Sequence, residues 1–238
     1  MEPAFENIQP KGATLPEQTA EQISRLIVEQ HLTCEDKLPS EFELAEMLGV
    51  GRGTVREGVK LLIARNVLEI RRGKGTYIAP NPGEIPDPLG FVYYPDQFRL
   101  AMDLAEIRLQ MEPWVARMAA ERATAEDLNN LREACCVVER DILAEQDHAK
   151  SDVAFHVAIA ECTHNLVVPK LIPIITYAIT LFVSLTKSRL KMETLVDHRE
   201  LLDSISSRDG ERAAGTMIRH IEYNRTLMQE IIGDLENR

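Results

Sequence analysis

Four side chains in the C-terminal half of this 238-residue chain have the types and spacing of a metal site. Asp152 and His156 lie four residues apart in SDVAFHVAIAE, so in a helix both project from one face. His198 begins the helical pattern HRELLDSI, and His220 closes MIRH on the next expected helix. One carboxylate and three imidazoles that converge between facing helices can share a divalent cation. Single histidines on helices are more often ordinary polar or core residues, and spacing alone leaves both interpretations open.

A second group of chemically capable residues lies between residues 51 and 80. The whole chain has a net charge of −11, but this segment holds seven basic residues against two acidic ones. Arg52 and Arg56 are four apart and share one helix face, and Thr54 lies between them. Arginine can fork onto guanine or phosphate, and a threonine hydroxyl can hydrogen-bond a phosphate. The local excess of positive charge favours a DNA-binding surface over the alternative of a solvated basic face.

The elements around these residues have the order helix, helix, helix, hairpin. Capping-box spacing predicts helices that begin near Thr14 and Ser40, and a third helix is expected over about 53–66. Alternating apolar residues over 67–79 flank a Gly-containing turn, which predicts two short strands. We therefore predict a winged helix-turn-helix over 14–80, preceded by a flexible arm at 1–13. In such a hairpin, Arg72, Gly73 and Lys74 form the tip, where they can reach the minor groove or its phosphates.

The rest of the chain is predicted to be an all-α bundle. Residues 80–97 hold five of the twelve prolines, which indicates a linker over 81–97. Helical periodicity then continues from 98 to 238, and it favours a bundle of about six helices. One of these helices is expected to span 166–190. The predicted fold is mainly α.

Composition limits the class of protein further. No apolar run was expected to reach the 18 or so residues of a membrane span, and the N-terminus lacks the apolar region of a secretion signal. The four cysteines form no CxxC pair, so we expect buried thiols of a cytoplasmic protein. These features favour a cytoplasmic protein without a membrane partner.

The segment LPSEFELAEMLGVGRGTVREGVKLLIARNVLEIRRGKGTYI resembles the DNA-binding domain of the GntR family of bacterial transcription regulators. The resemblance implies that Arg52, Thr54, Arg56 and Gly73 contact operator DNA. One departure stands out, because the family usually has arginine where this chain has Phe42. A phenyl ring cannot supply that hydrogen bond, so we expect a different operator preference at this position.

The segments LAEIRLQMEPWVARMAAE, DVAFH, DHRELLDSI and GTMIRHI resemble the FCD ligand-binding domain of the FadR subfamily. The resemblance implies that Asp152, His156, His198 and His220 hold a divalent ion, often zinc, although Ni²⁺ or Mn²⁺ also suit these ligands. It also implies that Arg108 reaches the effector. Arginine facing a metal gives a carboxylate two attachment points. The alternative for Arg108 is a surface or capping role.

Together these features predict a metabolite-responsive transcription regulator. A homodimer would bind double-stranded operator DNA and act as a repressor that a small carboxylate releases: a sugar acid, a hydroxy acid or a dicarboxylate. A metal-dependent enzyme with an accessory DNA-binding domain is the alternative, but no general-base glutamate of the HExxH type accompanies the ligands. A DNA-architectural protein whose bundle only dimerises would bind no metal.

Overall fold

The computed structural model describes residues 12–237, and the chain divides into two compact units, Met1–Pro88 and Leu89–Arg238. The predicted linker at 81–97 spans this division. Residues 1–11 of the predicted arm lie outside the described residues. Each unit has its own hydrophobic core, and each is described separately below.

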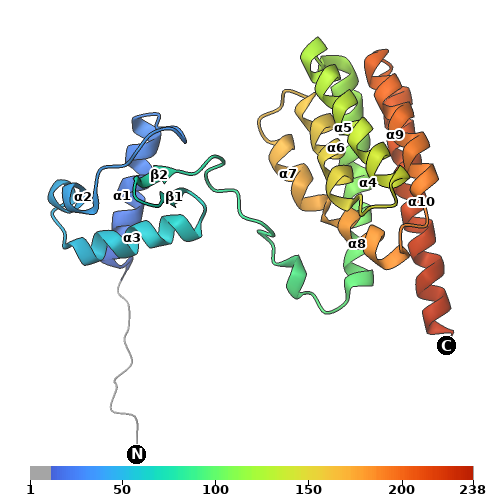
Figure 1. Cartoon of the computed structure of the whole chain (residues 1–238). Helices are drawn as coiled ribbons and strands as arrows, with labels where there is room; N and C mark the ends of the chain where they lie inside the picture. Colours follow the sequence, from blue (N-terminus) through green and yellow to red (C-terminus); the bar gives the residue numbers. More distant parts are fainter. Residues whose placement is uncertain (1–11, 238) are drawn as a thin grey trace, which may run out of the picture. The chain divides into compact units, whose positions relative to one another are not determined.

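The N-terminal unit is a winged helix-turn-helix, as predicted (Figure 1). Its elements are α1 Leu15–Glu29, α2 Glu41–Leu48, α3 Arg52–Ala64, β1 Leu68–Arg71 and β2 Gly75–Ile78. The predicted capping boxes at Thr14 and Ser40 are present, and in each a glutamate side chain accepts from the backbone N–H of the cap residue. Both boxes satisfy backbone donors that a helix N-terminus would otherwise leave unpaired.

Two left-handed glycines shape this unit. Gly49 ends α2 with φ 65°, which allows the tight turn into α3. Gly73 has φ 73° at the tip of the antiparallel β1–β2 hairpin, in which Leu68 pairs with Ile78. The apolar faces of the three helices and the hairpin meet in one core. The core residues are Ala20, Ile23, Ile27, Leu38, Leu44, Ala45, Val55, Val59, Leu62, Leu68 and Ile78.

The C-terminal unit is an all-α bundle, as predicted. Its elements are the 3₁₀ turn η1 Phe91–Tyr93 and the helices α4 Gln97–Arg122, α5 Ala125–Leu143, α6 Ala149–Glu161, α7 Val168–Ile175, α8 Tyr177–Thr186, α9 Lys191–Ser206 and α10 Gly210–Glu236. The long helices α4 and α10 lie against each other, and α9 packs on both α10 and α5 (Figure 1). Helix α6 packs on α4, α5 and α8, so it lies in the interior of the bundle.

The prediction of one helix over 166–190 is wrong. The structure divides this segment at Thr176 into α7 and α8, so the described bundle has seven helices rather than about six. Pro173 lies inside α7 and has no N–H to donate, which weakens the helical hydrogen-bond ladder just before the break. Helical periodicity continues across such a break, so it did not reveal the division.

The expectation that no apolar run is long enough to span a membrane is also wrong. Among the described residues, Val168–Thr186 meets the length and composition of a span, with a mean hydropathy of 1.8. The segment forms two helices instead of one, and both contribute to the bundle core through Ile172, Ala178 and Phe182. The high hydropathy therefore reflects core packing in this fold.

The four cysteines are free thiols. Cys135 and Cys162 are buried as expected, and burial raises their pKa values to about 11 and about 12. Cys136 is exposed, and Cys34 is half-buried. The expectation of buried thiols is therefore wrong for Cys136, which lies on the outer face of α5.

Gly58 provides a test of the α1–α3 packing. A Cβ atom there would lie 2.9 Å from Thr19 Cγ2 and 3.0 Å from the Pro16 carbonyl oxygen. We expect Gly58→Ala to destabilise the N-terminal unit by about 1–3 kcal/mol, because the two helices must separate. Gly53→Ala on the same helix has open space around its Cβ and should be neutral or stabilise by up to about 1 kcal/mol. Thermal unfolding followed by circular dichroism compares them, and equal effects would contradict this account of the packing.

Candidate metal centre and nucleic-acid interface

The structure brings together the four predicted metal ligands. Asp152 and His156 project from α6, His198 from α9 and His220 from α10. All four are buried, and one ligand atom from each lies within 4.8 Å of the others. Asp152 Oδ1 is 3.4 Å from His156 Nε2 and 3.5 Å from His198 Nε2. An ion bound at about 2.0–2.1 Å separates neighbouring ligand atoms in a tetrahedral site by roughly 3.3 Å, so the cluster has the size of a metal site.

The hydrogen bonding of these atoms fits a cation. Among the described residues, the buried polar atoms without a hydrogen-bond partner include Asp152 Oδ1, His156 Nε2 and both ring nitrogens of His198. Leaving such atoms unpaired in a protein interior costs about 1–3 kcal/mol each. A divalent cation between them would satisfy the carboxylate oxygen, His156 Nε2 and one ring nitrogen of His198 together.

A buried ion pair on α4 orients His156. Arg108 and Glu112 are one helical turn apart, and Arg108 Nε donates to Glu112 Oε1 at 2.5 Å. The second oxygen, Glu112 Oε2, lies 2.5 Å from His156 Nδ1. Burial opposes the ionisation of Glu112, but the neighbouring charges of Arg108 and His156 outweigh it and lower its pKa to about 2. An anionic Glu112 accepts the Nδ1 proton of His156, which leaves Nε2 facing Asp152 as the donor for a metal.

His198 and His220 differ from His156, because burial keeps both of them neutral. Burial is the main cause that lowers the pKa of His198, to about 4, and it also lowers the pKa of His220 well below its ordinary value. The neutral form is the one that binds metal ions. The ring of His198 stacks on Phe155, with centroids 4.3 Å apart, so packing fixes its orientation.

A small polar cavity of about 20 Å³ adjoins the cluster. Asp152 and His220 line it together with Arg108, which the structure places in the interior rather than at the surface or at a helix cap. His148, which precedes α6, also lines the cavity; it is buried, and its Nδ1 has no hydrogen-bond partner. The cavity therefore offers a guanidinium, an imidazole and the candidate metal cluster on its walls.

At the N-terminus of α3 the backbone donors lack a side-chain cap. Gly51 provides no capping side chain, and the first turn of α3 contains no acidic residue. By contrast, the N-termini of α1 and α2 are each capped by a hydroxyl group and a glutamate carboxylate. Free N–H groups and the helix dipole favour an anion, so this end of α3 is suited to a DNA phosphate.

Two residues of α2 hold the arginines of α3. Glu41 accepts from Arg56 Nη2 at 2.7 Å and from its Nε at 3.1 Å. The Arg52 guanidinium lies 5.7 Å from the centroid of the Phe42 ring. This distance is typical of a cation–π contact, which limits the directions in which Arg52 can point. Phe42 thus cannot donate the hydrogen bond of the arginine that the resemblance leads us to expect at this position. Its ring instead contacts the guanidinium of Arg52.

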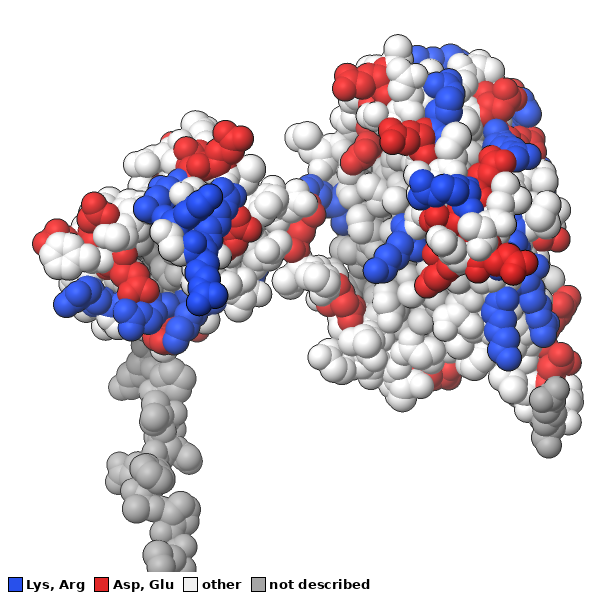
Figure 2. Space-filling model, viewed as in Figure 1, with Lys and Arg blue, Asp and Glu red and all other residues white. Residues whose placement is uncertain are grey.

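The wing adds exposed positive charge. Arg72 and Lys74 flank Gly73 at the hairpin tip, and all three are exposed. Arg71 differs, because it pairs with Glu69 and lies over the Tyr77 ring. Figure 2 shows lysine and arginine side chains gathered on the visible face of the N-terminal unit. A surface of this charge suits the phosphate backbone of DNA.

The fold and these two sites define a class of protein, a winged helix-turn-helix unit joined to a helical unit with a buried cluster that could hold a metal ion. Comparison with known proteins agrees. Residues 15–78 match the family model of bacterial regulatory proteins of the gntR family, and residues 103–223 match the FCD domain. The chain belongs to the GntR family, with a C-terminal FCD domain. It is a DNA-binding transcription regulator and not an enzyme, so the enzymatic alternative is wrong.

Individual relatives support the same family. The chain is 32% identical to the Uxu operon transcriptional regulator of Escherichia coli (strain K12), over 84% of this chain and 81% of the relative. It is 32% identical to the galactonate operon transcriptional repressor of the same strain, over 76% and 83%. The solved structure of Streptococcus agalactiae GntR has 38% identity and a TM-score of 0.77, and covers 89% of this chain and 99% of that one.

The sequence did not lead us to predict three residues of these two sites: Glu112 and His148 near the metal cluster, and Glu41 at the DNA-binding surface. Glu112 could have been found from its i,i+4 spacing to Arg108, which is typical of a helical ion pair. His148 directly precedes α6 and lies four residues before Asp152, so the spacing that places Asp152 and His156 on one face could have indicated it as well. Glu41 pairs with Arg56 across the turn, fifteen residues away, and only the packing of α2 on α3 reveals that contact.

The metal site is tested by thermal unfolding with and without Zn²⁺. When the free metal concentration is about 100-fold above Kd, binding adds about 2.7 kcal/mol to the free energy of unfolding. For a chain of this size, that increase raises Tm by roughly 5–10 °C. We expect Asp152→Asn to lose most of this rise, because it removes the anionic ligand. Asp103→Asn removes an exposed carboxylate on α4 and should keep the rise. A wild-type Tm that is indifferent to Zn²⁺, Ni²⁺ and Mn²⁺ would contradict the assignment.

The wing is tested by the salt dependence of DNA binding. Each phosphate contact contributes about 0.9 to the slope of log K against log salt. The double change Arg72→Ala and Lys74→Ala should reduce this slope by up to about 2, measured by fluorescence anisotropy on a random-sequence duplex. Arg25→Ala removes one exposed charge from α1 and should leave the slope unchanged. An unchanged slope in the double variant would exclude the wing from the interface.

Proposed function

We propose that this regulator is a repressor whose affinity for operator DNA falls when a small carboxylate binds beside a divalent metal ion in the FCD domain. The metal would be held by Asp152, His156, His198 and His220, with zinc the first candidate and nickel or manganese the others. The observation that carries this proposal is the buried ligand cluster with unpartnered atoms, directly beside a cavity lined by Arg108. The metal would supply a Lewis-acidic attachment point for an oxygen of the ligand.

The charges around the cavity favour an anion. When the metal-binding histidines are neutral, the carboxylates of Asp152 and Glu112 carry two negative charges. The Arg108 guanidinium and a divalent metal ion together carry three positive charges. One positive charge is then left in a buried site, where uncompensated charge is costly. A monoanionic carboxylate would neutralise it.

The names of two relatives support a sugar acid or a hydroxy acid within this class. One is the galactonate operon transcriptional repressor, and the other is the putative L-lactate dehydrogenase operon regulatory protein of Escherichia coli (strain K12). Hydroxyl groups of such a ligand would need hydrogen-bond partners, and the cavity wall contains several. The polar residues available are His148, Thr186, Ser188, Lys191, Thr194 and Asn224.

Ligand entry requires the cavity to grow. A volume of about 20 Å³ is sufficient for about one water molecule. The connection from α8 to α9 borders the cavity, and its residues Lys187 and Ser188 have φ of 53° and 56°. Two successive non-glycine residues in this region store backbone strain, so we infer that this connection moves when the ligand enters. Such a movement changes DNA affinity only if the ligand binds the two arrangements with different free energies.

DNA contact is assigned to six residues of the N-terminal unit. Arg52, Thr54 and Arg56 lie on α3 and would contact base edges or phosphates in the major groove. Arg72, Gly73 and Lys74 at the wing tip would contact the minor groove or its phosphates. Because Phe42 supports Arg52 instead of reading a base itself, operator preference would depend on Arg52 more than on position 42.

A homodimer on a pseudo-palindromic operator is the form we propose for the active regulator, in the cytoplasm and without a membrane partner. Exposed apolar side chains on two helices that contact each other support a dimer surface. Ile107 and Trp114 lie on α4, and Leu166, Val167 and Leu171 lie at the start of α7 and along it.

Gel-shift assays test the proposed switch directly. An operator selected from random duplexes would be titrated with the metal-loaded protein, with and without a panel of sugar acids, hydroxy acids and dicarboxylates. At least one acid should weaken DNA binding and emerge unchanged from the complex. Failure of the protein to select any duplex at low salt would overturn the proposal.

Arg108→Lys separates effector binding from folding. The substitution keeps a positive charge for Glu112 but loses the planar fork that binds a carboxylate at two points. We expect effector affinity to fall at least about tenfold with operator affinity unchanged, because a bidentate charged hydrogen bond is worth about 1.5–3 kcal/mol. Arg117→Lys, on the exposed side of the same helix, is the matched control. Equal effector affinity in the two variants would exclude Arg108 from the site.

A further inference from the structure

We propose that Asp197 is a positioning residue for His220, and that Arg219 holds Asp197 in place for this task. The inference rests on the metal site proposed above. Asp197 immediately precedes the ligand His198 on α9, and Arg219 immediately precedes the ligand His220 on α10. Each helix therefore contributes one candidate ligand and one member of the ion pair beside it.

The two oxygens of the buried Asp197 carboxylate have different surroundings. Oδ1 accepts from Arg219 Nε at 3.0 Å and from Arg219 Nη2 at 2.6 Å. Oδ2 has no hydrogen-bond partner and lies 3.8 Å from His220 Nδ1. One oxygen is thus occupied by the arginine, and the other faces the imidazole.

The chemistry of a histidine ligand explains this arrangement. An imidazole that binds metal through one nitrogen carries a proton on the other, and a buried N–H needs an acceptor. Because Nδ1 of His220 faces Asp197 Oδ2, Nε2 is the nitrogen left for the metal. Glu112 has the corresponding place at His156, whose Nδ1 it contacts at 2.5 Å, whereas Asp197 Oδ2 lies at the longer distance of 3.8 Å from His220 Nδ1. Asp197 would therefore fix the tautomer and ring direction of His220, as Glu112 does for His156.

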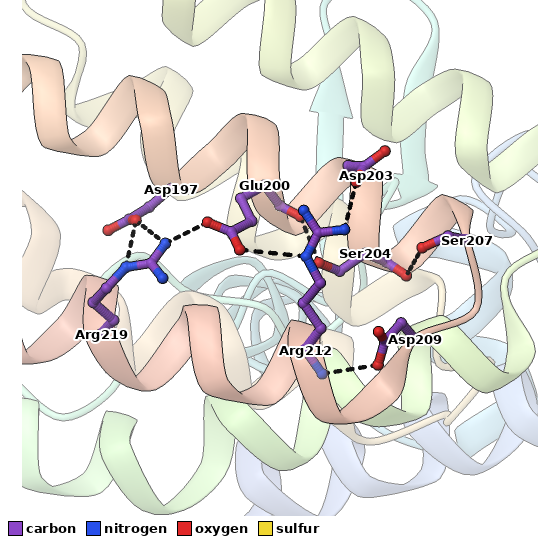
Figure 3. Close-up of polar contacts among 8 residues, drawn as sticks. All are labelled: Asp197, Glu200, Asp203, Ser204, Ser207, Asp209, Arg212 and Arg219. Carbon is purple, nitrogen blue, oxygen red and sulfur yellow. Dashed lines mark hydrogen bonds and ion pairs between the residues drawn. The ribbon is translucent and has the colours of Figure 1, made fainter.

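Arg219 connects this contact to the surface of the bundle. Its Nη2 also donates to Glu200 Oε2 at 2.6 Å, and Glu200 accepts from Arg212, which in turn donates to Asp203 at 2.6 Å. Figure 3 shows this row of alternating charges between α9 and α10. The row ends at Asp203, which is mostly exposed. It fixes the register of the two helices that carry His198 and His220.

A purely structural ion pair between α9 and α10 is the alternative role for Asp197. Such a pair would contribute to stability, but it would not affect the metal affinity of the folded protein. Asp197→Asn distinguishes the roles, because it has the same shape but removes the charge that accepts the Nδ1 proton of His220. Asp203→Asn makes the same chemical change at the far end of the row, so it is the matched control.

The experiment measures Zn²⁺ affinity of the full chain by competition with a chromophoric chelator, and the absorption spectrum of the Co²⁺-loaded protein. We expect Asp197→Asn to weaken Zn²⁺ binding about 10–100-fold, the usual effect of losing such a partner, and to alter the Co²⁺ spectrum. Asp203→Asn should stay within about twofold of wild type with an unchanged spectrum. Arg219→Gln removes the guanidinium that holds Asp197 Oδ1, and it should weaken Zn²⁺ binding less than Asp197→Asn does. If Asp197→Asn does not fold, the Zn²⁺ affinity of Arg219→Gln distinguishes the two roles of Asp197.

Two results overturn the inference in different ways. If wild-type protein binds Zn²⁺ and Asp197→Asn binds it equally well, Asp197 has only a structural role and the metal site stands. If wild-type protein binds neither Zn²⁺ nor Co²⁺, the proposed metal site and the role of Asp197 fall together.

Discussion

Charge buried inside the helical bundle is the constraint on which the C-terminal unit depends. Arg108, Glu112 and Asp152 are all buried, next to three imidazoles. Charged groups in such a place need partners, because desolvation costs several kcal/mol for each ion. Arg108 and Glu112 satisfy each other, and Glu112 also engages His156. Asp152 Oδ1 has no such partner among the described residues, and this deficit identifies the place where a cation fits.

The same constraint explains how four helices serve one site. Helix α4 provides the ion pair, α6 provides two candidate metal ligands, and α9 and α10 provide one candidate ligand each. The ligands are oriented in different ways: Glu112 contacts His156, Phe155 stacks on His198, and Asp197 faces His220. The ligand that we propose would change the balance of charge in the cavity and would therefore act on all four helices. The N-terminal unit contrasts with this, because its functional charges are exposed and its α3 N-terminus is uncapped.

Much of this could be predicted from the sequence, for physical reasons that differ between residues. Asp152 and His156 are four apart on one helix, so local geometry alone places them together. The winged helix followed from capping boxes and left-handed glycines, which are local signals as well. The break at Thr176 was missed because the apolar pattern continues across it, although Pro173 is a local signal for an interrupted helix. The contacts of Glu41 with Arg56 and of Asp197 with Arg219 join different helices, so they depend on packing that no spacing encodes. The cation–π contact of Phe42 with Arg52 is of the same kind.

We propose above that the buried cluster of the FCD domain holds a divalent metal ion. Anomalous diffraction from crystals of the purified protein, recorded above and below the absorption edges of zinc, nickel and manganese, tests it most directly. We expect one strong anomalous peak bonded to Asp152, His156, His198 and His220, at the edge of one of these metals. Crystals that diffract well but show no anomalous density among these four side chains, after growth with all three metals, would contradict it.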